Sequence, residues 1–338
     1  MKKILILGGS RLQMPVINSA LSRGYFVITC GNKPHDPGHR LSHEYHNISI
    51  LEKENVLALA REKEIDFVLS YCSEAGLMAA AFIAKQLSLP GAMPETIRLL
   101  TEKDRFRNFQ KANGFTYPAY WVLEKGDYPG NLSEAGLSLP LVVKPVDSTG
   151  CKGTCLIVDS EQIPEAINTA LSHSNQKRII IEEYITASRP EFTGDGFVSN
   201  GRLVFLNLGD HHYDETLNPL LSYCTSWPAS LTENENKEIT DLIESMLRAA
   251  GYTDGPFNVD LRMDSQGNIY ILELAPRNGG NFISKLMEYS TGFSSSDMIL
   301  NSLEGRIIKK FEITGRPVAN YIFHSKNQGI FQDMQIPD

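Results

Sequence analysis

The sequence predicts an α/β domain followed by a larger α+β region. Apolar strand-like runs alternate with helix-like runs through residues 1–92, which is typical of a parallel sheet with helices on both faces. Beyond them, strand-like runs come in pairs joined by glycine-containing turns, which indicates antiparallel hairpins. At 338 residues the chain is too long for one ordinary core, so more than one domain is expected.

Three strand signals and three helix signals alternate in the first region. The first helix has Pro15 near its start and ends at Gly24, and the last helix stops at Pro90. The expected strands are 3–9, 25–30 and 65–72, and the expected helices are 14–24, 55–64 and 75–91. This order predicts a Rossmann-like scaffold.

The first strand ends in Gly8-Gly9, which raises the question of a dinucleotide site. The Gly-x-Gly-x-x-Gly fingerprint is incomplete, and the second strand ends in Cys30-Gly31-Asn32 where a ribose-binding acid would be expected. We therefore interpret Gly8-Gly9 as a tight turn and disfavour an NAD-dependent oxidoreductase.

The second region begins with a charged helix at 101–115 and apolar strands at 142–145 and 178–185. Two hairpins follow, the first turned at Asn200-Gly201 and the second around 266–268, with an amphipathic helix ending at Gly251 between them. The last residues, 316–338, predict a strand, a turn at 327–329 and a short second strand.

The composition of the chain argues against several classes of function. The net charge of -8 argues against a general polyanion binder, so no nucleic-acid partner is expected. No run approaches the roughly 18 apolar residues of a membrane span, and no membrane association is expected. Five cysteines without a C-x-x-C pair indicate neither a disulfide framework nor a zinc cluster, and we expect a reduced, cytoplasmic protein.

Lys144 ends an apolar strand and is followed by a loop rich in glycine and hydroxyl residues, "VVKPVDSTGCKGT". An ammonium group and loop N–H groups both favour concentrated negative charge, which suits a polyphosphate. The pattern is not a P-loop, because Lys144 precedes the loop instead of lying inside it.

The second hairpin carries two acids. Counting back from its turn places Asp260 and Glu273 across from each other, and two carboxylates with room for phosphate oxygens and water suit Mg²⁺. Arg277 follows in a loop, where its planar guanidinium could hold a phosphoryl or carboxylate group. A surface hairpin with solvated acids is the alternative, and the hairpin alone does not decide between them.

The ordered set of Lys103, Lys144, the glycine loop, "EEYI", Glu191, the two hairpin acids and Arg277 resembles the ATP-grasp superfamily over nearly the whole chain. The opening "LGGSRLQMPVI" is similar to that of its carbamoyl-phosphate-synthase-like branch, which includes carboxylate-amine ligases. The resemblance implies a Rossmann-like pre-ATP-grasp domain (1–92), an ATP-grasp α+β fold (93–305, with a lid at about 115–185) and a short β segment (306–338).

The same resemblance implies how ATP is held. Lys103 and Lys144 would contact the phosphates, and the loop from Asp147 to Gly153 would close over them. The predicted loop contacts are Ser148, Thr149, Gly150 and Gly153. The predicted adenine edge runs from Glu182, which would reach the exocyclic amine, through the backbone of Glu183 and Ile185. Glu191 falls where the family places its ribose-binding acid.

For the reacting end, the resemblance implies that Asp260 and Glu273 bridge Mg²⁺ to the phosphates and that Arg277 holds the γ-phosphoryl and acyl phosphate. ATP and two Mg²⁺ ions are the expected cofactors, with Mn²⁺ an acceptable substitute. Two departures are Ala275, where many members have asparagine, and Asp260, where glutamate is common. Asn278 is a candidate to complete the metal shell.

The activity implied is an ATP-dependent carboxylate-amine ligase that forms an acyl phosphate and releases ADP and phosphate. Its partners would be small carboxylate and amine substrates, and a homodimer is left open. Two alternatives remain: a bicarbonate-activating carboxylase of the purine-biosynthesis type, which shares "APR" at 275–277, and an ATP-binding protein without turnover.

Substrate selection is expected around Arg11, Ser73, Glu74 and 211–218. Adjacent histidines on a strand point to opposite faces, so His211 and His212 rarely share one metal ion, and one of them could face the substrate or both could lie in a solvated loop. Cys151 is interpreted as a small loop residue.

Overall fold

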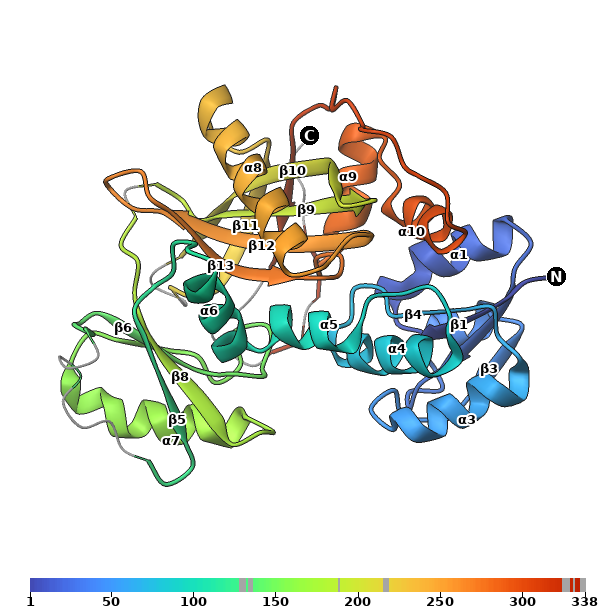
Figure 1. The fold of residues 1–338 in the computed structure, drawn as a ribbon, viewed down its shortest axis with the longest axis horizontal. Helices are drawn as coiled ribbons and strands as arrows, with labels where there is room; N and C mark the ends of the chain where they lie inside the picture. The colour runs from blue at the N-terminus through green and yellow to red at the C-terminus, as the bar shows by residue number, and fades with distance from the viewer. Residues whose placement is uncertain are drawn as a thin grey trace.

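The computed structural model describes residues 1–127, 132, 136–187, 189–214, 219–323, 329–330 and 332–334. They form three sheets in three parts of the molecule (Figure 1). The parallel-sheet domain lies on the right of that view, a six-stranded antiparallel sheet, here the large sheet, lies at the top, and a four-stranded antiparallel sheet, here the small sheet, lies at the lower left.

The parallel-sheet domain has strand order β3-β2-β1-β4, with all neighbours parallel. Its strands are β1 (Lys3–Leu7), β2 (Phe26–Cys30), β3 (Glu44–His46) and β4 (Phe67–Leu69), and its helices are α1 (Met14–Ser22), α2 (Pro37–Leu41), α3 (Lys53–Lys63) and α4 (Glu74–Leu87). Ile4 and Ile6 pack with α1 on one face, and Leu5 and Leu7 pack with α3 and α4 on the other. The predicted α/β architecture is confirmed, although β3 and α2 were not predicted.

The Gly8-Gly9 turn is filled by the protein's own side chains. Gln13, in the short 3-10 helix η1 (Arg11–Gln13), is buried and accepts from the Ser10 hydroxyl at 2.6 Å. A Cβ at Gly9 would lie 2.4 Å from the His39 ring. Glycine is therefore needed because another side chain occupies the space, as in the tight-turn interpretation.

The large sheet has order β13-β12-β9-β10-β11-β14, with antiparallel neighbours throughout. Its strands are β9 (Phe192–Ser199), β10 (Arg202–Tyr213), β11 (Ser222–Trp227), β12 (Gly255–Met263), β13 (Ile269–Ala275) and β14 (Val318–Tyr321). Both predicted hairpins are confirmed, and Asn200 and Gly201 have the left-handed φ values of 51° and 69° that such a turn requires. The predicted turn at 327–329 lies mostly outside the described residues.

Helices cover both faces of the large sheet. One face packs on α8 (Glu233–Ala249) through Ile239, Ile243 and Met246. The other face shares one apolar cluster with α9 (Ile283–Thr291), α10 (Ser295–Leu303) and the α1 face of the parallel sheet. The large sheet and the parallel-sheet domain are therefore packed against each other through a common core.

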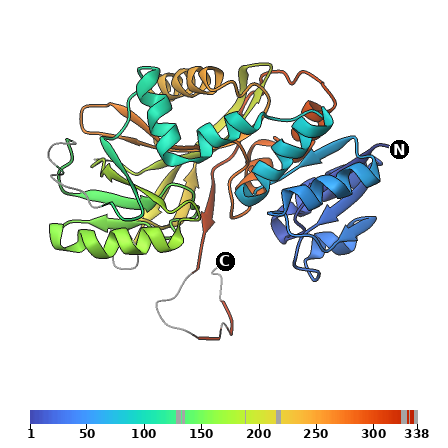
Figure 2. The same cartoon turned by 60° about the horizontal axis from the view of Figure 1, so that its bottom comes forward.

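The small sheet has order β5-β8-β6-β7 and is covered by α7 (Ile163–His173), with the 3-10 helix η3 (Ser160–Gln162) before it. Its strands are β5 (Tyr120–Glu124), β6 (Leu141–Pro145), β7 (Cys155–Ile157) and β8 (Arg178–Glu183). Two helices, α5 (Pro94–Thr101) and α6 (Lys103–Ala112), lead to it from the parallel-sheet domain (Figure 2). None of the helices in the described ranges is long and apolar enough to cross a membrane.

Candidate active site

A cavity of about 150 Å³ lies between the small and large sheets. Its lining brings together ten of the predicted site residues: Lys103, Lys144, Ser148, Gly150, Glu182, Glu183, Ile185, Glu191, Asp260 and Glu273. Thr149, Gly153 and Arg277 are not in the lining. A second cavity, of about 500 Å³, lies near α4, α5 and α10, but its mainly apolar lining contains none of the predicted site residues.

The two lysines enter the cavity from different elements. Lys144 ends β6, and Lys103 is the first residue of α6, where its Nζ donates to the Ser148 carbonyl at 2.6 Å. The Lys103 backbone N–H also donates to the Val146 carbonyl at 3.0 Å, which fixes the start of α6 against the end of β6. Both ammonium groups are thus placed next to the glycine loop.

Lys144 is held by a buried ion-pair triad. Its Nζ lies 2.6 Å from Glu182 Oε2, and Arg107 Nε lies 2.9 Å from Glu182 Oε1. Burial would raise the pKa of Glu182, but Arg107 and Lys144 outweigh it and lower that pKa to about 2. Because both carboxylate oxygens already have cationic partners, an adenine amine would have to share an oxygen with Lys144 or Arg107.

Arg107 was missed by the sequence reasoning. It follows Phe106 in α6, is fully buried, and also donates to the Leu272 carbonyl of β13 at 2.8 Å. The sequence did contain an indication of this role. Arg107 lies on the same side of an amphipathic helix as Phe106 and Phe109, and a cation buried there needs a buried acid as its partner. Arg107 connects the small sheet to the large one.

Glu191 has two partners that were also missed. Its Oε2 lies 2.7 Å from Arg262 Nε, and its Oε1 accepts from the Tyr213 hydroxyl at 2.7 Å. Arg262 donates to the Ile185 carbonyl as well, and the Glu183 N–H donates to the Ala119 carbonyl. In the predicted adenine edge, the Ile185 carbonyl and the Glu183 N–H therefore already have hydrogen-bond partners within the protein.

Asp260 and Glu273 are directly opposite in the β12–β13 register, as predicted, with a bulge immediately after Asp260. Asp260 accepts from the Thr193 hydroxyl at 2.6 Å, and His211 Nε2 lies 3.9 Å from it. Burial, followed by repulsion from Glu273 and Glu191, raises the pKa of Asp260. The acids therefore favour a proton or a cation between them.

This donor set fits Mg²⁺ that is shared with a ligand. Across the described ranges, no group of three or more His, Cys, Asp or Glu side chains is arranged to hold a metal ion by itself. Mg²⁺ is commonly bound through one or two carboxylates plus substrate phosphates and water, and Asp260 and Glu273 supply that number. The Oδ1 of Asn278, the candidate to complete the metal shell, already accepts from the Ser295 hydroxyl at 2.7 Å.

Arg277 lies beyond the acids, at the junction with the parallel-sheet domain. Its Nη2 is 3.1 Å from Glu74 Oε2, at the start of α4, and 3.7 Å from Glu273 Oε1. Burial opposes the charge on Arg277, but Glu74 and Glu273 outweigh it and raise its pKa. Burial and Glu273 raise the pKa of Glu74. Glu74, predicted near the substrate, is thus next to the predicted phosphoryl-binding arginine.

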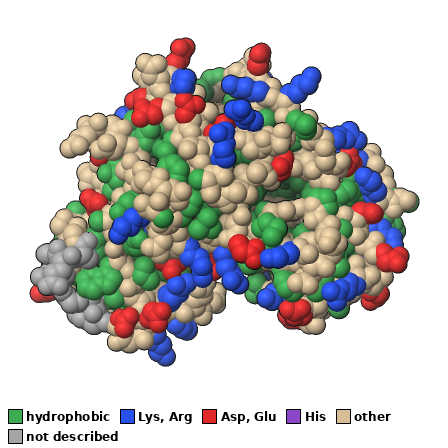
Figure 3. Space-filling model, viewed as in Figure 1, with side chains coloured by type: hydrophobic (Ala, Val, Ile, Leu, Met, Phe, Trp, Pro, Cys, Tyr) green, Lys and Arg blue, Asp and Glu red, His purple; other side chains and the backbone are tan. Residues whose placement is uncertain are grey.

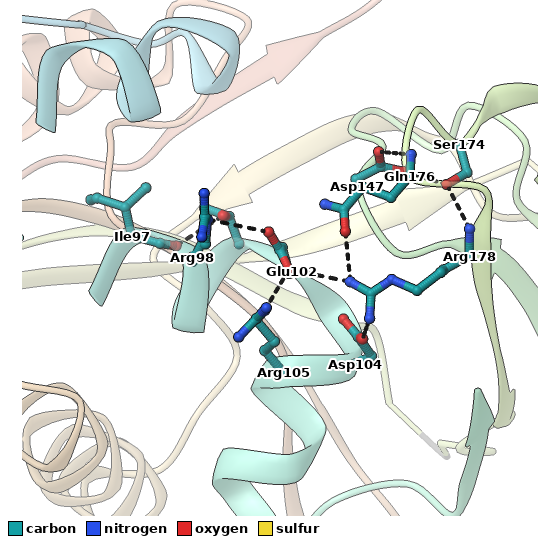
Figure 4. Close-up of polar contacts among 10 residues, drawn as sticks. Ile97, Arg98, Glu102, Asp104, Arg105, Asp147, Ser174, Gln176 and Arg178 are labelled. Carbon is teal, nitrogen blue, oxygen red and sulfur yellow. Dashed lines mark hydrogen bonds and ion pairs between the residues drawn. The ribbon is translucent and has the colours of Figure 1, made fainter. Parts of the chain in front are cut away.

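The glycine loop is anchored at Asp147, where it begins (Figure 4). Asp147 accepts from the Ser174 hydroxyl at 2.8 Å and from the Gln176 N–H at 3.0 Å. At the other end, a Cβ on Gly153 would lie 2.7 Å from His173 Cβ. Within the loop, Cys151 Sγ donates to the carbonyl of Leu220, in the turn that precedes β11 of the large sheet, at 3.1 Å.

The same view shows how the small sheet is joined to α6 (Figure 4). Arg178 of β8 lies 2.5 Å from Asp104 and 3.4 Å from Glu102, both at the start of α6. Glu102 also pairs with Arg105 at 2.6 Å. This ion-pair network fixes the orientation of the helix that begins with Lys103.

The two histidines have separate partners. His211 bonds to the Thr225 hydroxyl at 2.7 Å, and His212 bonds to Ser226 at 2.8 Å. Burial lowers the pKa of His211, which lies near Asp260. Residues 215–218, predicted with them near the substrate, lie outside the described residues.

On the face seen in Figure 3, Lys and Arg side chains are interspersed with Asp and Glu. The surface is notched at its lower edge, between the small-sheet side and the parallel-sheet domain. That notch separates the two parts that α5 and α6 connect.

Comparison with known proteins relates this geometry to a family. Residues 137–285 match a family model described as an ATP-grasp domain. The chain is 23% identical to the L-arginine-specific L-amino acid ligase of Bacillus subtilis over 74% of its length, and 23% identical to the N5-carboxyaminoimidazole ribonucleotide synthase of Staphylococcus saprophyticus over 84%. It covers 60% and 73% of those relatives, and only 41% and 26% of two other curated relatives.

Solved structures share the fold. The L-amino acid ligase from Bacillus licheniformis superposes with a TM-score of 0.83 at 23% identity, with 98% of this chain and 82% of that one covered. The N5-carboxyaminoimidazole synthetase from Staphylococcus aureus, solved with ADP, gives 0.77 at 18% identity, with 94% and 81% covered.

Proposed function

We propose that the chain, whose residues 137–285 match an ATP-grasp domain, is an ATP- and magnesium-dependent carboxylate-amine ligase. The observation that carries the proposal is one cavity in which two lysines from the small-sheet side face two opposed carboxylates of the large sheet. A polyphosphate suits such a site, because the cations neutralise its charge while the acids share a divalent ion with it.

The chemistry follows from the poor reactivity of a carboxylate. Transfer of the γ-phosphoryl group of ATP to a carboxylate oxygen gives an acyl phosphate, whose carbonyl carbon an amine can attack with loss of phosphate. Lys103 and Lys144 would hold the phosphates in line for transfer, and the contribution of the protein is mainly positioning and charge neutralisation. Held by Asp260 and Glu273, Mg²⁺ would neutralise charge on the phosphate oxygens.

The contacts of Arg277 support a role on the other side of the reaction. It lies between Glu273 and Glu74, so its guanidinium is between the phosphoryl-transfer acids and the parallel-sheet domain. We assign it to the transferred phosphoryl group and the acyl phosphate. The carboxylate substrate would then bind between Arg277 and the loops that follow β4.

The L-amino acid ligases among the similar proteins make amino acids the first substrates to test. The experiment measures ADP release from Mg·ATP with pools of amino acids and other carboxylates, with and without bicarbonate. Glu273→Ala should abolish turnover, whereas Glu238→Ala, an exposed acid of α8, should leave it unchanged.

Each outcome selects one function. Turnover that requires a carboxylate and an amine supports the ligase. Turnover that requires bicarbonate and an amine supports the carboxylase, which the N5-carboxyaminoimidazole ribonucleotide synthase relative makes the second candidate. ATP binding without turnover in any pool supports a binding protein.

A further inference from the structure

A row of buried polar side chains crosses the large sheet on the face that meets the parallel-sheet domain. Asn207, Asp195 and Asn258 are register partners on β10, β9 and β12, and their exposed fractions are 7%, 4% and 8%. Asp195 is two residues after Thr193, so it lies on the same face as the Thr193–Asp260 pair and about 7 Å further along the strand.

Asp195 has one occupied oxygen and one free oxygen. Its Oδ1 accepts from the Gly279 N–H at 2.8 Å and from Asn258 Nδ2 at 3.0 Å. Within the described part of the chain, its Oδ2 is buried and has no hydrogen-bond partner. A buried carboxylate oxygen without a donor is costly, which indicates a place for a donor that the protein itself does not supply.

A second buried group without a hydrogen-bond partner lies in the loop that contains Gly279. Asn278 Nδ2 is buried and, within the described ranges, has no acceptor, and Asn278 directly precedes Gly279. The charged and titratable groups that face Asp195 are Arg277 from this loop and Tyr71 and Cys72 from the segment after β4. Arg277 is itself paired with Glu74. No ammonium group of the described residues occupies the free oxygen.

We propose that Asp195 binds the ammonium group of the amine substrate through its free Oδ2 and takes a proton from it. The proposal rests on the proposed ligase function. It places the amine on the same face of the large sheet as Asp260, separated from it by one side-chain repeat of the strand. The ligand class is a primary ammonium, such as the α-ammonium of an amino acid.

The step balances as follows. The ammonium loses one proton to Asp195, and the nitrogen lone pair attacks the carbonyl carbon of the acyl phosphate. A C–N bond forms, the bond from carbon to the phosphate oxygen breaks, and phosphate leaves with that electron pair. Of the three ammonium protons, one stays on the amide, one goes to the phosphate, and the one on Asp195 passes to solvent.

The protonation state of Asp195 agrees with this role. Burial raises its pKa to about 6, against the hydrogen bonds from Gly279 and Asn258 and the charge of Arg277. The carboxylate is therefore ionised at neutral pH. Its pKa is close enough to neutral pH for the group to accept and release a proton.

The test separates activation of the carboxylate from transfer to the amine. Hydroxylamine is unprotonated at neutral pH, needs no base, and traps an acyl phosphate as a hydroxamate. Asp195→Asn keeps an oxygen that can accept from Gly279 and Asn258. We expect hydroxamate formation within about twofold of the unchanged protein, and amide formation with the amine substrate lower by about 10²–10⁴-fold.

Asp210→Asn is the matched control. Asp210 is a buried acid on the neighbouring strand β10, and both its oxygens accept from the Ser230 N–H, so any effect should be equal on the two reactions. An equal loss of both reactions in Asp195→Asn would make Asp195 a structural residue and overturn the proposal, as would no loss in either.

A measurement on the unchanged protein covers the case in which Asp195→Asn does not fold. Amide formation should rise with pH through about 6, while hydroxamate formation at a constant concentration of unprotonated hydroxylamine should not, and parallel profiles under that condition would contradict the assignment. If the protein without substitutions forms neither product from any carboxylate, the proposed ligase function is wrong, and the role inferred for Asp195 is then wrong as well.

Discussion

Lys144 would be a costly residue to bury without its partners. Burial lowers its pKa and Glu182 opposes that change, while Arg107 supplies the second cation on the same carboxylate. Removing one member of a buried ion pair is far more damaging than replacing all of it, because a charge is left unpaired. The triad is therefore a place where single substitutions should have large effects.

Arg107→Met should lower the free energy of unfolding by about 3–5 kcal/mol, because Glu182 keeps one cationic partner instead of two. Arg105→Met is the control on the same helix, since Arg105 is about half exposed and its pair with Glu102 should be worth about 0–1 kcal/mol. Urea unfolding at pH 7 measures both. Equal effects of the two substitutions would contradict the importance of the buried triad.

Asp195→Asn should stabilise the protein at pH 7. The folded-state pKa of about 6 exceeds the ordinary value of 3.8, so the folded protein binds this proton more tightly, and ionisation of Asp195 destabilises the fold above about pH 6. A neutral amide avoids most of that penalty, and we expect a gain of about 1–3 kcal/mol. The gain should shrink as pH falls from about 6 towards 4, where the unchanged protein also carries a neutral side chain. Thermal melts of both proteins across this pH range measure the gain in stability. A gain that grows as the pH falls would contradict the raised pKa of Asp195.

At the scale of elements, the long periodic segments were the predictable ones. The alternation in the first region gives β1, β2, β4, α1, α3 and α4, and the turn at 266–268 sets the register that opposes Asp260 to Glu273. The short β3 and α2 were missed because residues 37–46 have little apolar periodicity and depend on packing against β2. The partners of the site acids, Arg262 for Glu191 and Arg107 for Glu182, could not be paired, because each pair joins elements at least 71 residues apart.

Arg178→Gln tests how the small sheet is attached to α6. The substitution leaves Asp104, which is buried, without its 2.5 Å partner and loosens the helix that carries Lys103. We expect the KM for Mg·ATP to rise several-fold with a smaller change in kcat, together with faster hydrogen exchange in 178–183. Lys177→Gln, an exposed neighbour, is the control, and an unchanged KM in Arg178→Gln would show that the network does not position Lys103.

At the scale of the whole molecule, the parallel-sheet domain contributes a residue to the proposed site as well as lying next to it. It supplies Glu74 to Arg277, and Tyr71 of the same segment bonds to Ser284 of α9 at 3.0 Å and accepts from Ser296 of α10 at 3.1 Å. ATP would be held between the two antiparallel sheets, and the other substrates would be held where the large sheet meets this domain.

Glu74→Gln should therefore affect the carboxylate more than ATP. It removes the charge that raises the pKa of Arg277 and fixes its Nη2, and we expect the KM for the carboxylate to change about tenfold or more while the KM for Mg·ATP stays within about twofold. Glu95→Gln, an exposed acid of α5, is the matched control. A change in the KM for Mg·ATP alone would show that Glu74 does not act on the carboxylate substrate.

The contact from Cys151 to the Leu220 carbonyl has a kinetic consequence. It joins the glycine loop to the large sheet at a cavity of about 150 Å³, below the roughly 300–1,000 Å³ of typical ligand sites. We therefore expect the sheets to separate before a nucleotide enters, so that a first-order opening precedes the second-order encounter. In stopped-flow mixing, the observed association rate should reach a plateau at high ATP, and Cys151→Ala should raise that plateau.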